Sequence, residues 1–199
     1  MRTSILIGLG IILLAGVAGE TALAETKTKP ATKSVTISKQ DIRGAASIQK
    51  LVKRNKWQDV KKQIKRVKNK DLRRALTWQR LTSQNSGSSF FEITHFIENN
   101  SNWPSQRRLR QRAEEAMTAN MDPERVLNWF KDHEPLTSDG GIRLGAALLK
   151  LERKPDAIKI LRKTWVEGNF GARQERQFYK RYRRFLTREN HIERLERLL

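Results

Sequence analysis

Apolar residues recur three and four positions apart along most of the chain, a spacing that predicts amphipathic α-helices. The clearest case is residues 90–97, where Phe90, Ile93, Phe96 and Ile97 fall on one helical face. No segment shows sustained alternation of apolar and polar residues, and no Asn-Gly hairpin signal is present. The pattern therefore predicts an all-α fold.

Residues that favour helix starts divide this pattern into about ten short helices. Their side chains accept hydrogen bonds from first-turn amides, and the candidates are Ser38, Asn69, Ser88 or Ser89, Asp122, Thr137 or Ser138, and Thr187. Pro104 is expected to open another helix, because proline suits the first helical position. The apolar face of the last helix is expected to consist of Ile192, Leu195, Leu198 and Leu199.

Short loops between consecutive helices require neighbouring helices to run antiparallel. We therefore predict an array of about ten short antiparallel helices that forms a superhelical, tetratricopeptide-like solenoid. No strict repeat of about 34 residues is visible, so the repeats would be degenerate. A compact bundle of the same helices is the alternative architecture.

The N-terminus has the pattern of a secretory signal peptide over residues 1–24. Arg2 supplies the positive start, residues 5–18 are apolar, and a small-residue cleavage site ends at Ala24. An uncleaved membrane anchor is the alternative, but the apolar run is shorter than the roughly 20 residues that a helix needs to span a bilayer. We expect cleavage after Ala24, a periplasmic protein, and no stable membrane span after cleavage.

The chain after the predicted cleavage site is strongly basic. Residues 25–38 are rich in lysine and threonine and lack an apolar pattern, which predicts a disordered basic linker before a helical domain at 39–199. The whole chain carries 41 Lys and Arg against 21 Asp and Glu, a net charge of +20. Such an excess attracts polyanions, whether nucleic acid, anionic lipid or an acidic wall polymer.

Positive charge is densest over residues 50–74, where only Asp59 and Asp71 oppose a run of lysines and arginines. A second basic cluster lies at 173–184. The candidate residues for binding an anionic polymer are Lys61, Lys62, Lys65, Arg66, Arg107 and Arg110. The alternative interpretation is an ordinary solvated surface on a very basic protein.

Nucleic acid is not the expected partner of this basic run. Single strands are bound by aromatic side chains interleaved with cations, and here only Trp57 and Trp78 flank the run, both at apolar-face positions. Because the chain is expected to be exported, wall carboxylates or anionic lipid headgroups are better partners.

Other chemistry finds little support in the sequence. Cysteine is absent, and the three histidines His95, His133 and His191 are far apart, so no metal site is predicted. The glycines at 140–145 lack the strand and the Lys-Ser/Thr pair of a phosphate loop, which favours close helix packing instead. Five glutamates lie on helices or helix starts, and the pattern places most of them on polar faces; they are Glu92, Glu98, Glu114, Glu115 and Glu124. We predict no catalytic residue and no cofactor.

An ordered set of motifs runs through residues 76–199. They are TWQRL (77–81), SSFFEITHFIENNSNWP (88–104), LRQRAEEAM (109–117), VLNWF (126–130), a turn at 135–141, ALLKLERKPDAIKILRKTWVEGNF (147–170) and HIERLERLL (191–199). In this order and spacing they resemble the N-terminal superhelical domain of the soluble lytic murein transglycosylase family. One departure is Glu152, where the resemblance implies a glycine-like turn residue.

The resemblance implies a role in the cell wall. Members of the family cut the glycan strand of peptidoglycan without water and form an anhydro sugar. That activity belongs to a lysozyme-like domain, whose catalytic glutamate is typically followed by serine. This sequence contains no Glu-Ser dipeptide, so the catalytic domain is expected to be missing from it.

Two functions remain open at this point. The first is a non-catalytic helical scaffold, associated with peptidoglycan binding or turnover, whose partner is peptidoglycan or a catalytic cell-wall enzyme. The alternative is a stand-alone helical-repeat module that binds another protein.

Overall fold

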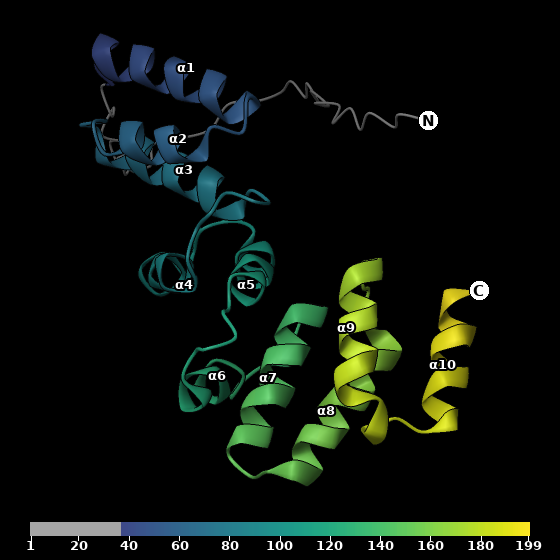
Figure 1. Cartoon of the computed structure of the whole chain (residues 1–199). Helices are drawn as coiled ribbons and strands as arrows, with labels where there is room; N and C mark the ends of the chain where they lie inside the picture. Colours follow the sequence, from purple (N-terminus) through teal and green to yellow (C-terminus); the bar gives the residue numbers. More distant parts are fainter. Residues whose placement is uncertain (1–36) are drawn as a thin grey trace, which may run out of the picture. The chain divides into compact units, whose positions relative to one another are not determined.

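The predicted helical pattern is realised as ten α-helices and one 3-10 helix, with no strand, within residues 37–199, which the computed structural model describes (Figure 1). The helices are α1 (Lys39–Lys53), α2 (Trp57–Ile64), α3 (Lys70–Thr82), α4 (Phe90–Asn99), α5 (Gln106–Glu115), α6 (Pro123–Trp129), α7 (Ser138–Lys150), α8 (Lys154–Glu167), α9 (Ala172–Tyr182), η1 (Arg183–Phe185) and α10 (Arg188–Leu198). The all-α prediction is confirmed for this part of the chain. The predicted signal peptide and most of the predicted linker lie outside it.

Local capping explains where most of the helices begin. The predicted caps are confirmed, because each side chain accepts a hydrogen bond from the backbone amide three residues later; they are Ser38, Asn69, Ser89, Asp122, Thr137 and Thr187. At α4 the cap is reciprocal, since Glu92 also accepts from the backbone of Ser89 at 3.1 Å.

The start of α5 differs from the prediction that Pro104 opens it. The helix begins at Gln106, and Ser105 before it adopts a left-handed backbone with φ of 63°. Two side chains fix this turn: the Trp78 indole donates to the Pro104 carbonyl at 2.9 Å, and Gln106 donates to the Trp103 carbonyl at 3.0 Å. The Trp78 contact comes from 26 residues back along the chain, outside the local Trp-Pro pattern, and the helix begins two residues later than predicted.

Helices pack against their neighbours in chain order. All substantial contacts among the described helices join partners at most two α-helices apart, and Figure 1 shows α1–α3 together and α7 beside α8. Buried apolar residues gather in three successive clusters, formed by α1–α3, by α3–α8 and by α8–η1. Each cluster removes apolar surface from water, which is the main favourable term in folding.

Small residues bring α7 and α8 close together. A Cβ at Gly141 would overlap the Thr164 side chain, and one at Gly145 would lie 2.6 Å from Leu161 Cδ2. This confirms that these glycines serve helix packing. The turn between the two helices places Glu152 at φ of 59°, a left-handed conformation that glycine adopts without a steric penalty. The glycine-like position implied by the resemblance is therefore occupied by a glutamate.

The last helix packs differently from the prediction. Its expected apolar face is exposed, with Ile192 at 45%, Leu195 at 58%, Leu198 at 57% and Leu199 at 97%. The buried residue of α10 is Arg194, which donates to the carbonyls of Trp165 at 2.6 Å and Gly168 at 3.1 Å. These acceptors lie at the end of α8, so hydrogen bonds rather than leucines orient α10.

A search of residues 37–199 for a membrane-spanning helix found none that is both long and apolar enough.

Candidate anion-binding groove

A groove with a volume of about 430 Å³ lies where α2, α3 and α4 meet. Its lining is mostly cationic and consists of Lys61, Ile64, Lys65, Lys70, Arg73, Arg74, Thr77, Arg80, Glu92, Phe96 and Asn100. Six of these side chains are basic, and one is a carboxylate. The groove is therefore a concentration of positive charge in a concave surface.

Helical spacing explains why these cations meet. Lys61 on α2 and Lys65, the residue that ends α2, are four apart in helical conformation, so they lie on the same face. Lys70, Arg73, Arg74, Thr77 and Arg80 follow the same rule along α3. Leu76, on the adjoining face of α3, is buried in the first apolar cluster.

Glu92 is the carboxylate in this lining, and it already has partners. Lys61 contacts it at 2.8 Å and Arg80 at 3.1 Å. Burial raises the pKa of Glu92, but hydrogen bonds from Lys61 and Ser89 and the charge of Arg80 outweigh it and lower the pKa to about 2. Glu92 is thus ionised at neutral pH and is held in ion pairs, which excludes it as a general acid.

Arg80 is the most buried cation of the groove, with 6% of its side chain exposed. Besides Glu92, it donates to the Ser88 hydroxyl at 2.8 Å. These bonds fix the position of the Arg80 side chain in the groove lining.

The remaining cations are weakly neutralised. Arg73 donates to the Val67 carbonyl at 3.2 Å, and Arg74 lies 3.9 Å from the exposed Asp71. Lys65 and Lys70 have no acidic partner in the part of the chain that the structure describes. Free ammonium groups and guanidinium edges suit carboxylate or phosphate oxygens. The groove can therefore bind an anion, but its lining offers no nucleophile activated by a base.

The structure separates the six residues predicted for anion binding. Lys61 and Lys65 line the groove, whereas Lys62 and Arg66 are exposed outside its lining. The other two, Arg107 and Arg110, are exposed on α5, away from this lining.

The six predicted residues omit five charged members of the groove: Lys70, Arg73, Arg74, Arg80 and Glu92. The first three belong to the basic run at 50–74, whereas Arg80 and Glu92 lie outside it. The available signals were the position of Arg80 ten residues after Lys70 on α3, and the capping role of Glu92, which places it in the first turn of α4. Neither signal indicates that the two side chains meet.

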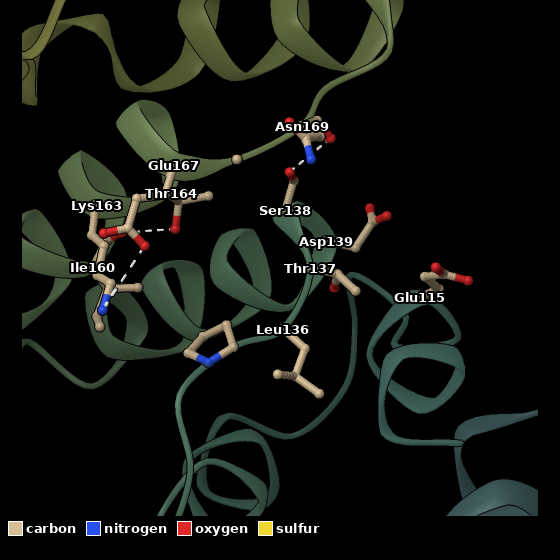
Figure 2. Close-up of a pocket in the computed structure, with 12 residues that line it drawn as sticks. Glu115, Leu136, Thr137, Ser138, Asp139, Ile160, Lys163, Thr164, Glu167 and Asn169 are labelled. Atoms are coloured by element: carbon tan, nitrogen blue, oxygen red, sulfur yellow. Dashed lines mark hydrogen bonds and ion pairs between the residues drawn. The ribbon is translucent and has the colours of Figure 1, made fainter. Parts of the chain in front are cut away.

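A second hollow, of about 360 Å³, lies among α5, α7 and α8. Figure 2 shows Lys163 and Glu167 on one side of it and Glu115 and Asp139 on the other. Its hydroxyl groups are used internally: Ser138 donates to the Asn169 carbonyl at 2.9 Å, and Thr164 donates to its own helix (Figure 2). Burial raises the pKa of Glu115, which nevertheless pairs with Arg112 at 2.5 Å.

Glu114, beside this hollow, corrects the expectation that the glutamates lie on polar faces. It is fully buried, and its carboxylate accepts hydrogen bonds from the amides of Leu136 at 2.9 Å and Thr137 at 2.8 Å and from the Thr137 hydroxyl at 2.7 Å. Burial raises its pKa, and these donors oppose the rise. The role of Glu114 is to hold the segment that starts α7.

The histidines do not form a site. His95 is exposed on α4, His133 packs edge-on against Trp129, and His191 packs edge-on against Trp165. Among residues 37–199, no group of three or more His, Asp or Glu side chains is arranged to hold a metal ion.

Comparison of the chain with protein-family models, with curated proteins and with solved structures gave no match. The function of the groove is therefore inferred from its own residues and charges.

Proposed function

We propose that this protein is the non-catalytic helical scaffold of a lytic murein transglycosylase-like protein of the periplasm. Its groove between α2, α3 and α4 would bind peptidoglycan through the carboxylates of that polymer. The observation that carries the proposal is the lining of six cations, opposed only by Glu92, which is already paired.

Sequential packing of the helices supports the solenoid part of the proposal. Repeat arrays bury their cores between neighbours in chain order, as the described helices do. The α7–α8 hairpin also has the tight turn that the family resemblance implies, with Glu152 at the left-handed position. Such arrays present extended surfaces on which a long polymer can lie.

The aromatic content of the groove argues against a single-stranded nucleic acid. Phe96 is the aromatic residue of the lining, and it is buried and packed edge-on against Trp103 at 5.9 Å between ring centroids. It offers no open face on which a base could stack. A polymer recognised through its carboxylates needs no such face.

The test is co-sedimentation of the mature chain with purified peptidoglycan sacculi. We expect binding that weakens as salt is raised from about 50 to 200 mM, because the contacts are between exposed charges. The variant Lys65→Glu/Lys70→Glu should bind about tenfold more weakly, which is the effect of losing two favourable charge contacts and introducing two repulsive ones.

The matched control is Lys150→Glu/Lys154→Glu, which makes the same charge change at exposed lysines of α7 and α8 outside the groove. If both double variants lose binding equally, net charge rather than the groove explains the attraction. The supernatants are also assayed for anhydro-muropeptides. We expect none, and their release would contradict the non-catalytic scaffold.

A stand-alone protein-binding module is the second candidate function. The observation that favours it is the exposed apolar face of α10, formed by Ile192, Leu195, Leu198 and Leu199. Contiguous exposed apolar surface often marks a protein contact. Absence of sacculus binding at low salt would favour this candidate over the scaffold.

A further inference from the structure

An aromatic hollow separate from the basic groove lies between α8, α9 and α10. Its volume is about 510 Å³, and it is lined by Trp165, Ala172, Glu175, Arg176, Tyr179 and His191. Three of these six side chains are aromatic rings, and each comes from a different helix. Neither the proposed function nor the sequence motifs assign a role to this hollow.

The three rings lie close together. Ring centroids are 5.5 Å apart for Trp165 and His191, 5.9 Å for Trp165 and Tyr179, and 5.9 Å for Tyr179 and His191. Trp165 is 5% exposed, whereas Tyr179 is 44% exposed and His191 is also exposed. The hollow therefore has a buried aromatic residue at its base and two accessible rings around it.

Trp165 also has an unused hydrogen-bond donor. Its indole Nε1 is buried and has no acceptor among the described residues. Buried donors are normally paired, because leaving one without a partner costs free energy. Because Nε1 itself is inaccessible, a bound molecule reaches this donor only if the Trp165 side chain shifts.

The charges around the rings disfavour a cationic ligand. The Glu175 carboxylate is already paired, because it accepts from Arg194 at 3.0 Å. The Arg194 guanidinium already lies 4.5 Å from the Trp165 ring centroid, and exposed Arg176 adds a second positive charge, so a cation is disfavoured. Together these groups provide both a hydrogen-bond acceptor and donors around an apolar base.

We propose that this hollow binds one sugar ring of a glycan strand. A sugar ring is neutral, has apolar C–H faces that pack on aromatic rings, and has hydroxyl edges that match a carboxylate and a guanidinium. The choice of an N-acetylhexosamine as the sugar depends on the proposed function, because peptidoglycan glycan strands contain such units.

The experiment is a titration of the mature chain with N-acetylglucosamine and its β-1,4-linked trimer. Binding is followed by calorimetry and by the indole N–H resonance of Trp165, assigned with Trp165→Phe. A single ring of about 15 heavy atoms should bind with a Kd of about 1 mM, the range expected for a ligand of that size. The Trp165 resonance should shift and saturate.

Tyr179→Ala removes an accessible ring, and we expect the Kd for the trimer to rise at least about tenfold. Arg176→Ala, at an exposed position, is the second variant and should weaken binding several-fold. Phe91→Ala is the matched control, because Phe91 is an aromatic residue of similar exposure, 52%, on the distant α4. Circular dichroism checks that each variant is folded.

Three outcomes would overturn the inference. The Trp165 resonance could fail to shift up to about 50 mM sugar, the folded Tyr179→Ala variant could bind the trimer as tightly as the parent, or choline could displace the sugar, which would indicate a cation site. The groove variant Lys65→Glu/Lys70→Glu should keep sugar binding. If the parent chain binds the sugar but not sacculi, the groove proposal fails. If it binds sacculi but not the sugar, the hollow proposal fails.

Discussion

At the scale of single residues, Glu114 and Gly140 form a lock between α5 and α7. The Glu114 carboxylate accepts hydrogen bonds from Leu136 and Thr137, which precede α7, and Thr137 in turn caps α7 through the Gly140 amide at 2.9 Å. A Cβ at Gly140 would overlap the Glu114 carboxylate. Glycine is therefore required here by the close approach of a buried side chain.

Gly140→Ala should lower the free energy of unfolding by about 1 to 3 kcal/mol, because an added methyl group must displace Glu114 from its donors. Urea unfolding measures the change. The control is Gly44→Ala in the middle of α1, where a Cβ has open space, and it should stabilise the protein by about 0.5 to 1 kcal/mol.

A double-mutant cycle with Glu114→Ala tests the lock itself. If Gly140→Ala is as destabilising without the Glu114 carboxylate as with it, the two residues are not coupled.

Glu92 makes stability depend on pH. Its pKa is about 2 in the folded protein against an ordinary value of 4.5, so the ionised form is favoured by folding. This stabilisation is present above pH 4.5 and is lost as the pH falls towards 2. Since Glu92 is partly exposed, with 29% of its side chain accessible, screening reduces the effect to about 1 to 2 kcal/mol.

We expect the free energy of unfolding of Glu92→Gln to be about 1 to 2 kcal/mol lower than that of the parent at pH 6. The difference should be smaller at pH 2.5, where the Glu92 contribution is mostly lost. Urea unfolding at both pH values measures it. Glu98→Gln on the same helix is the control, because exposed Glu98 has no ion pair in the described part of the chain. A Glu92→Gln difference that is unchanged at pH 2.5 would rule out the ion pairs as its source.

At the scale of helices, α10 is attached by an arginine. Arg194 is 6% exposed, donates to two carbonyls at the end of α8, pairs with Glu175, and stacks on Trp165. A guanidinium can make this set of planar bonds and an ammonium cannot. The leucines of α10, in contrast, are exposed and add little to its attachment.

Arg194→Lys should therefore release α10, costing about 2 kcal/mol or more locally. Hydrogen exchange of the α10 amides should become about 30-fold faster, which is the rate equivalent of that free energy. Leu195→Ala should change the exchange rates by less than about twofold, since an exposed substitution costs at most about 0.5 kcal/mol. Equal effects of the two variants would show that the leucines hold the helix after all.

Helices could be predicted where the deciding contacts are local. Cap residues lie within three positions of the amides they bind, so Ser38, Asn69 and Thr187 identified their helices correctly. The apolar spacing of α10 suggested the wrong inner face, because the Arg194 bonds reach 26 and 29 residues back along the chain. Spacing within one helix contains no information about such partners.

At the scale of the whole described unit, the order of the helices could be predicted from the sequence, but the groove could not. Packing between near neighbours makes the element order predictable from periodicity and breaks. The groove needs α2, α3 and α4 to meet, and its central ion pair joins Arg80 to Glu92 across a loop. Lys61 and Lys65 were predicted because their charge is visible in the run, whereas Arg80 and Glu92 gain their roles only from the fold.

Asp41 has a consequence for how far the chain can be trimmed. Its buried carboxylate accepts from the amides of Lys68 at 2.9 Å and Asn69 at 3.1 Å, immediately before α3. A chain that begins at residue 37 keeps these two hydrogen bonds to Asp41. One that begins after Asp41 leaves two amides unpaired beside Lys70, so the shortest stable fragment that retains an intact basic groove must include the first turn of α1.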